Sequence, residues 1–260
     1  MPRFSANLSI LFGDLPFLDR FQAAREAGFS AVECWFPHEH GVNDIAQRLG
    51  DLDLKMVGIN SAHGDAADWG LAALPGRESE FKTSIEQALQ SATRFDNCAV
   101  HVMAGLAGSV RREDAWQTYL KNLECAVRIA EGSGVQLLIE PLNSRDRPGY
   151  LLHSVEQAAQ IIERTGLSSL RIMFDCYHVQ VEEGDLISRM RRHWSKIGHL
   201  QIACPPSRSE PGTGELDYDF IFAEIDSLGW SGWVGAEYIP SGKTIDSLSW
   251  FHKHAAVLRG

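Results

Sequence analysis

The sequence predicts an α/β fold, a single (β/α)8 TIM barrel that forms one domain over residues 1–260. Short apolar segments alternate with longer amphipathic segments, eight of each, and this alternation is typical of a parallel sheet covered by helices. A length of 260 residues suits eight such repeats in a closed barrel. The first repeat lacks a G-x-G-x-x-G turn, which argues against an open dinucleotide-binding sheet.

The strands are predicted where short apolar runs, rich in β-branched residues, end in polar or turn residues. In order they are RFSANL, AVECW, KMVGIN, NCAVHVM, VQLLIE, LRIMFD, IGHLQI and WVGAEY, which cover residues 3–8, 31–35, 55–60, 97–103, 135–140, 170–175, 197–202 and 233–238.

The helices are predicted where apolar residues recur at intervals of three and four. Several of these segments end at a glycine, the residue most often found just past a helix C-terminus. In order they cover residues 17–27, 42–49, 77–94, 113–132, 154–165, 185–194, 218–228 and 241–258.

Composition argues against two classes of partner. The formal net charge is −10, and an acidic protein is a poor ligand for nucleic acid or an anionic membrane. The sequence contains neither an apolar run long enough to span a bilayer nor a signal-peptide layout at its start. The five cysteines are scattered and form no C-x-x-C pair, so we expect a cytoplasmic protein with reduced thiols.

Four polar residues end apolar segments that have the pattern of buried strands. They are Glu140, Asp175, Gln201 and Glu237, and they lie roughly one strand-plus-helix repeat apart. Burying an unpaired carboxylate or amide is costly, and the carboxyl ends of barrel strands meet at the mouth where barrel enzymes keep their catalytic groups. We therefore expect one functional site at this mouth, with pairing of single acids to rim Lys or Arg as the alternative.

This all-oxygen set is typical of a site for a hard divalent cation. Carboxylate and amide oxygens suit Mg²⁺ or Mn²⁺, whereas zinc draws more on His and Cys. A cation held by Glu140, Asp175, Gln201 and Glu237 would relieve the repulsion between the three acids. Whether activity requires the metal stays open.

Four further residues are candidates for substrate binding. His178 closes the segment DCYH, so it shares a face with the aspartate if a helix begins there. Asn143 follows the glutamate of EPLN. Arg208 lies in the long loop after the seventh strand, and a guanidinium can bind a carboxylate through two parallel hydrogen bonds. His63 lies in the loop after the third strand, where it is either a site residue or simply exposed.

Other polar and aromatic residues near the predicted mouth have weaker interpretations. Arg145 and Arg147 are alternatives to Arg208 as the anion-binding group. The remaining residues are interpreted as loop anchors (Asn7, Glu33), buried strand residues (His101, His199) and walls of the site (Trp35, Trp69).

Several segments together resemble the hydroxypyruvate isomerase family, which belongs to the xylose isomerase-like barrels. They are RFSANLSILFGDLPFLDRF, LLIEPLN, FDCYH, IGHLQIA, the loop around PGTGE and GWVGAEY, and they cover nearly the whole chain in the family's order. The resemblance implies an isomerase of short hydroxy-oxo acids that converts hydroxypyruvate to tartronate semialdehyde (2-hydroxy-3-oxopropanoate). It also implies that Glu140 and Glu237 are the proton donor and acceptor, and that Glu140, Asp175, Gln201 and Glu237 bind a metal.

One loop departs from the family's pattern. After the third strand the family reads N-L-P-A-G-D-W-A-A-G-E-R-G, whereas this chain reads NSAHGDAADWG, which is shorter and lacks the arginine. The substrate therefore stays open between hydroxypyruvate and 2-oxo-tetronate. The alternatives from other classes are a ketose 3-epimerase, a metal-dependent endonuclease-like phosphodiesterase and a non-catalytic sugar-acid binder. The expected partner is a small hydroxy-oxo acid, and assembly into a homo-oligomer is left open.

Overall fold

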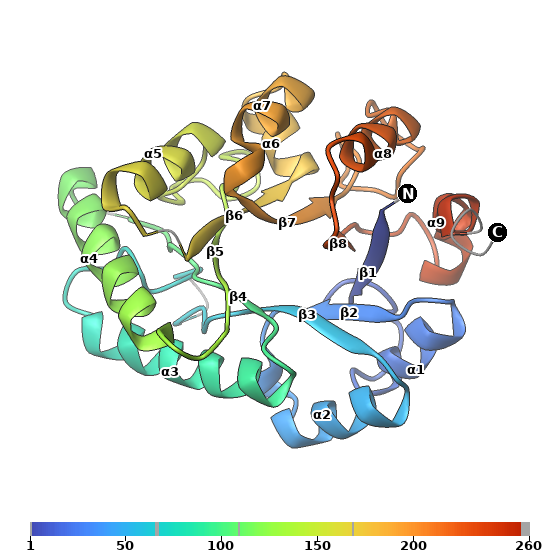
Figure 1. Cartoon of the computed structure of the whole chain (residues 1–260), viewed down its shortest axis with the longest axis horizontal. Coiled ribbons are helices and arrows are strands. Elements are labelled where there is room, and N and C mark those ends of the chain that lie inside the picture. The colour runs from blue at the N-terminus through green and yellow to red at the C-terminus, as the bar shows by residue number, and fades with distance from the viewer. Residues whose placement is uncertain (1, 66–67, 109, 168, 256–260) are drawn as a thin grey trace.

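The computed structural model describes residues 2–65, 68–108, 110–167 and 169–255. Within these residues, eight parallel strands form a closed barrel in chain order, and β8 pairs with β1. Figure 1 shows the helices arranged outside this ring of strands. The predicted (β/α)8 barrel is therefore confirmed.

The strands lie where the apolar runs predict them. They are β1 Arg3–Asn7, β2 Ala31–Cys34, β3 Lys55–Asn60, β4 Ala99–His101, β5 Leu137–Ile139, β6 Leu170–Asp175, β7 Ile197–Ile202 and β8 Trp233–Ala236. β4 and β5 are shorter than predicted at both ends, and at their starts the backbone is not yet extended into the strand. Asn97 has a positive φ of 58°, and the backbone N–H of Val135 donates to the hydroxyl of Ser133.

The helices that follow the strands are mostly amphipathic, with their apolar faces packed on the barrel. They are α1 Asp19–Glu26, α2 Val42–Asp51, α3 Glu78–Arg94, α4 Arg112–Ala130, α5 Val155–Thr165, α6 Cys176–Glu182, α7 Leu186–His193, α8 Tyr218–Ser227 and α9 Ser249–Ala255, with 3-10 turns η1 Pro37–Glu39, η2 Trp194–Lys196 and η3 Thr244–Ser247. α5 is delimited by local chemistry, because the Ser154 hydroxyl accepts from the N–H of Gln157 and Gly166 adopts a left-handed conformation.

The last predicted helix, 241–258, differs from the structure at its start. The chain forms the short turn η3 and then α9, and residues 256–258 lie outside the described residues. Phe4 of β1 contacts the rings of Phe222 in α8 and Trp250 in α9, at centroid distances of 4.9 and 5.1 Å. These aromatic contacts hold the last two helices against the closing strand pair.

No helix among the described residues is both long enough and apolar enough to cross a membrane.

Candidate active site

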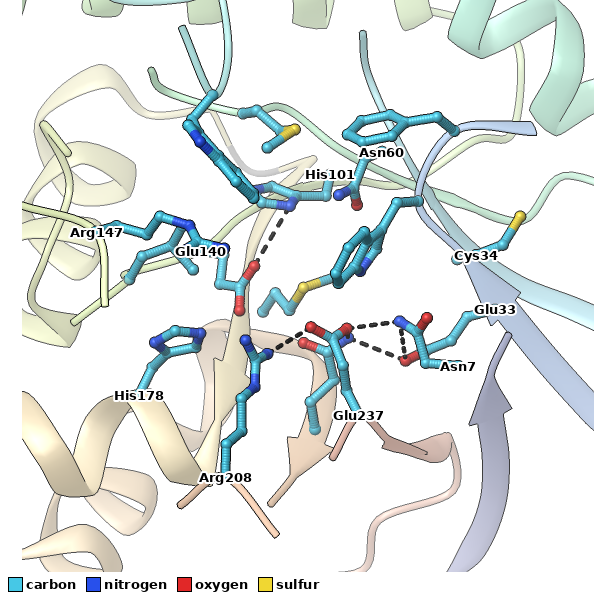
Figure 2. Close-up of a pocket in the computed structure, with 18 residues that line it drawn as sticks. Asn7, Glu33, Cys34, Asn60, His101, Glu140, Arg147, His178, Arg208 and Glu237 are labelled. Carbon is cyan, nitrogen blue, oxygen red and sulfur yellow. Dashed lines mark hydrogen bonds and ion pairs between the residues drawn. The ribbon is translucent and has the colours of Figure 1, made fainter. Parts of the chain in front are cut away.

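The four predicted site residues lie together at the carboxyl ends of the strands. Asp175 and Gln201 are the last pair of register partners between β6 and β7. Glu140 and Glu237 directly follow β5 and β8. All four are buried. Glu140, Gln201 and Glu237 line one cavity, shown in Figure 2, and Asp175 lies next to it through its contact with Arg208.

Arg208 supplies a buried positive charge between two of these acids. Its Nη2 donates to Glu237 Oε1 at 2.6 Å and lies 3.5 Å from Asp175 Oδ2. Its own carbonyl accepts from the N–H of Ile239 at 2.7 Å, which ties the loop after β7 to the segment after β8. The predicted loop after the seventh strand thus reaches the mouth, and its guanidinium partly neutralises the acids there.

The environment separates the acid strengths of the two glutamates. Burial raises the pKa of Glu237 to about 7, while the nearby Arg208 opposes the rise. Burial raises the pKa of Glu140 well above its usual range, and the neighbouring Glu237 adds to this rise. The nearest imidazole to Glu140 is that of His101, at 3.4 Å, and burial holds the pKa of that ring at about 3. At neutral pH Glu140 is therefore the better proton donor and Glu237 the better acceptor.

A buried hydrogen-bond network under the cavity fixes Gln201 and Glu237. The side-chain amide of Gln201 donates to Glu33 at 3.0 Å and to Glu237 at 2.7 Å. Asn7 Nδ2 donates to Glu237 Oε2 at 2.6 Å, and His199 Nε2 lies 2.7 Å from Glu33. Asn7 Oδ1 accepts from the N–H of Ser9 at 3.0 Å, so Asn7 anchors the loop after β1 as interpreted from the sequence. Asn7 and Glu33 also orient the site residues.

The sequence carried one signal for this network. A Cβ added to Gly235 in β8 would lie 2.4 Å from Glu33 Oε1, so only glycine leaves room for the buried carboxylate. Glycine inside a strand often marks a close approach of this kind.

The donor set fits a divalent cation. Glu140, Asp175 and His178 each offer one ligand atom within 4.8 Å of the others. Glu140 Oε1 and Gln201 Oε1 are buried without a hydrogen-bond partner among the described residues, and such oxygens need a cation or a polar ligand.

His178 is better suited to hydrogen bonding than to metal binding. The backbone N–H of Asn143 donates to His178 Nδ1 at 3.1 Å, and the Asn143 side chain is also within 2.7 Å of this nitrogen. Burial and the nearby Arg208 lower the pKa of His178 well below its usual value, so the ring is neutral. A neutral ring that accepts at Nδ1 carries its proton on Nε2, which lies 3.7 Å from Asp175 Oδ2.

The other predicted substrate-binding residues occupy different places. Asn143 is buried behind His178 and orients that ring. His63 packs against the ring of Phe36 and lies 3.3 Å from Glu39 on a partly exposed surface. His63 is outside the set of described residues that line the cavity, whereas Trp35 and Trp69 belong to it.

Arg145 and Arg147 point to different surroundings. Arg145 is exposed and donates to the Tyr177 hydroxyl and to the carbonyl of Pro206. Arg147 lines the cavity, and its guanidinium carbon lies 3.6 Å from the ring centroid of Trp69. The sequence did not separate these two arginines, because both lie in one loop two residues apart.

Known proteins resemble this chain over nearly its full length. A family model described as xylose isomerase-like TIM barrel matches residues 21–254. A 2-oxo-tetronate isomerase of Cupriavidus necator is 45% identical over 96% of this chain and 97% of its own length. A hydroxypyruvate isomerase of Escherichia coli is 39% identical, over 96% of this chain and 98% of its own. The crystal structure of a protein named AP endonuclease, family 2, from Brucella melitensis is 38% identical, has a TM-score of 0.95 and covers 98% of this chain and 99% of its own.

Proposed function

Because the chain belongs to the xylose isomerase-like TIM barrel family, we propose that it isomerises short hydroxy-oxo acids through an enediolate. The observation that carries the proposal is the pair Glu140 and Glu237, which are buried, line one cavity and have raised pKa values. Hydroxypyruvate is the first candidate substrate, and tartronate semialdehyde is its product.

The reaction moves one proton between adjacent carbons. Glu237 removes a proton from the hydroxymethyl carbon of hydroxypyruvate, and the electron pair forms a carbon–carbon double bond while the ketone oxygen becomes anionic. A proton moves between the two substrate oxygens, and Glu140 delivers its proton to the former carbonyl carbon. The pKa of Glu237, about 7, suits that carboxyl group to accept a proton, and the pKa of Glu140, raised well above its usual value, keeps a proton on that group for delivery.

Positive charge and hydrogen-bond donors stabilise the intermediate. The buried guanidinium of Arg208 contacts Glu237 and lies beside the place where the enediolate oxygens develop charge. The Nε2–H of His178 lines the same cavity and can donate to a substrate oxygen. We keep both residues as substrate-binding groups, and we assign Asn143 the role of orienting His178.

The residues proposed to hold Mg²⁺ or Mn²⁺ are Glu140, Asp175, Gln201 and Glu237. The unpartnered oxygens of Glu140 and Gln201 support this assignment. A bound cation supplies Lewis-acid stabilisation to adjacent substrate oxygens. Arg208 contacts two of the four proposed ligands, Asp175 and Glu237, so a bound cation would share these carboxylates with the guanidinium.

The second candidate substrate is 2-oxo-tetronate. The Cupriavidus necator relative carries that name and is 45% identical, slightly more than the hydroxypyruvate isomerase of Escherichia coli.

Two other reactions suit the site less well. An endonuclease, the activity for which the Brucella melitensis protein is named, needs a basic surface for nucleic acid, whereas the net charge here is −10. A ketose 3-epimerase acts on a neutral chain, whereas two arginines line this cavity.

The cysteines are free thiols, which supports a reducing compartment and a cytoplasmic location as part of the proposal.

Steady-state kinetics on three compounds test the assignment. We expect turnover of hydroxypyruvate, 2-oxo-tetronate or both, and none of the neutral ketose fructose. The larger kcat/KM identifies the preferred acid. Epimerisation of fructose with neither acid consumed would contradict the proposal.

A further inference from the structure

We propose that Arg147, held against the indole of Trp69, is the residue that binds the carboxylate of the substrate. The inference rests on the proposed function and names the specificity-determining group of that site. It applies to hydroxypyruvate and 2-oxo-tetronate alike, because both acids carry the carboxylate next to the reacting carbons.

The cavity creates a charge problem for an anionic substrate. Three glutamates, Glu33, Glu140 and Glu237, line it, and Asp175 lies directly beside it. Arg208 is already engaged, because it contacts both Glu237 and Asp175. A substrate carboxylate therefore needs a second cation that no protein carboxylate has taken.

Arg147 meets this requirement. It is half-buried, it lines the cavity, and it forms no ion pair with a carboxylate among the described residues. Its Nη1 donates to the backbone carbonyl of Asp146 at 2.8 Å, which leaves the other guanidinium N–H groups for a ligand. Figure 2 shows Arg147 on the same side of the cavity as Glu140 and His178. A carboxylate bound here would place the neighbouring carbons toward the catalytic glutamates.

Trp69 fixes the plane of the guanidinium. The guanidinium carbon of Arg147 lies 3.6 Å from the indole centroid, a stacking distance that leaves the edge of the fork free for a carboxylate. Burial and the nearby Arg208 lower the pKa of Arg147, and an anion in this position would relieve the repulsion between the two cations.

The described part of the loop around Trp69 is attached to the barrel through Gly70. The N–H of Gly70 donates to the carbonyl of His63 at 2.8 Å, and Gly70 bridges Ala104 after β4. Gly70 has a φ of 128°, and an added Cβ would lie 2.5 Å from the carbonyl oxygen of Met103. Trp69 thus lies in the loop that departs from the family's sequence pattern.

The alternative arginine is occupied elsewhere. Arg145 is exposed, hydrogen-bonds to Tyr177 and Pro206, and lies outside the described residues that line the cavity. It lies in the same loop as Arg147 and has the same charge. Arg145→Ala is therefore a matched control for Arg147→Ala.

Kinetics on hydroxypyruvate and dihydroxyacetone separate the two arginines. Dihydroxyacetone replaces the carboxylate with a hydroxymethyl group. Loss of a charge-assisted bidentate contact predicts that Arg147→Ala raises the KM for hydroxypyruvate roughly 10- to 100-fold and removes most of the preference over dihydroxyacetone. The KM of Arg147→Lys for hydroxypyruvate should lie between those of wild type and Arg147→Ala. Trp69→Leu should raise this KM about 3-fold, because only the stacking contact is lost. Arg145→Ala is expected to leave the KM within about 2-fold of wild type.

Calorimetric binding of glycerate tests the same site without turnover. Glycerate keeps the carboxylate but cannot undergo the isomerisation, and circular dichroism verifies that each variant is folded. If Arg147 binds the carboxylate, Arg147→Ala should weaken glycerate binding by the same factor as it raises the KM for hydroxypyruvate. An unchanged KM and glycerate affinity in folded Arg147→Ala, or an equal loss in Arg145→Ala, would overturn the inference. The two proposals can fail separately. If wild type turned over neither acid but bound glycerate, and Arg147→Ala did not bind it, the isomerase proposal would fail and the carboxylate site would stand.

Discussion

Glu140 and Glu237 are the same residue type beside the same cavity, but their neighbours give them different proton affinities. Glu237 lies 2.6 Å from the guanidinium of Arg208, whereas Glu140 faces the imidazole of His101, which burial keeps neutral. One carboxyl group is thus closer to its charged form and the other closer to its protonated form. This difference is the physical basis for assigning an acceptor and a donor.

Replacing either glutamate by glutamine tests the assignment directly. Glu140→Gln and Glu237→Gln keep the shape of the side chain but cannot exchange a proton, so each is expected to lower kcat by at least about 100-fold with the fold intact. Glu163→Gln serves as the control, because Glu163 is an exposed residue of α5 paired with Lys196. Near-wild-type turnover in either active-site variant would refute the roles given to these residues.

At the scale of elements, the packing of β8 against the Glu33 side chain of β2 depends on one glycine. The missing side chain of Gly235 leaves room for the Glu33 carboxylate, which in turn orients Gln201. The close approach of the β8 backbone to Glu33 and the orientation of Gln201 therefore depend on the same glycine.

Gly235→Ala is expected to destabilise the protein and disturb the site together. The added methyl group would have to displace a buried carboxylate, at a cost of about 1–3 kcal/mol in the free energy of unfolding, and kcat should fall. Gly50→Ala is the comparison, because Gly50 lies in α2 with nothing within 4 Å of an added Cβ. That change should stabilise the helix by roughly 0.5–1 kcal/mol. Urea unfolding measures both effects, and equal stabilities for Gly235→Ala and wild type would contradict the coupling.

The sequence predicted the strands and most helices because each element has its own apolar periodicity. It predicted Glu140, Asp175, Gln201 and Glu237 for a related reason, since a polar residue after a buried strand is conspicuous. The sequence did not predict α6 as a separate helix, because it begins at Cys176, directly after β6. The side chain of Asp175 caps it by accepting a hydrogen bond from the N–H of Tyr177.

Contacts between distant segments could not be predicted in this way. The roles of Asn7 and Glu33 depend on hydrogen bonds across the barrel, such as the one from Asn7 to Glu237. The difference between Arg145 and Arg147 depends on a loop that places Trp69 beside only one of them. No local pattern in the sequence encodes either contact.

For the whole molecule, closing the barrel brings Glu140, Asp175 and Glu237 together in a buried site, where their negative charges repel each other. Burial raises the pKa values of Glu140, of Glu237 to about 7 and of Asp175 to about 6. A folded state that holds protons more tightly than the unfolded state loses stability as pH rises through this range. The site therefore lowers the stability of the fold at neutral pH.

The pH dependence of Glu237→Gln measures this cost. Between the usual carboxyl pKa of 4.5 and the folded value of about 7, the wild-type protein should lose up to about 3 kcal/mol that the variant keeps. The free energy of unfolding of the variant, relative to wild type, should therefore rise from pH 5 to pH 8 with chelator present. Comparing the two proteins cancels the opposite contribution of His101, whose pKa is lowered. A difference independent of pH would show that Glu237 titrates normally in the fold.

Proton NMR of hydroxypyruvate in D₂O, with and without chelator, reports whether the carbon-bound hydrogen exchanges with solvent during turnover. An enediolate formed by carboxyl groups exchanges with solvent, so the account predicts deuterium at the new carbon–hydrogen centre of the product and in recovered substrate, above the level without enzyme. Glu237→Gln should abolish deuterium uptake in both substrate and product, whereas Glu140→Gln should abolish product formation and leave Glu237 able to exchange hydrogen at the hydroxymethyl carbon of the substrate. Conversion without any solvent deuterium would indicate direct hydrogen transfer within the substrate and would contradict the two-glutamate mechanism.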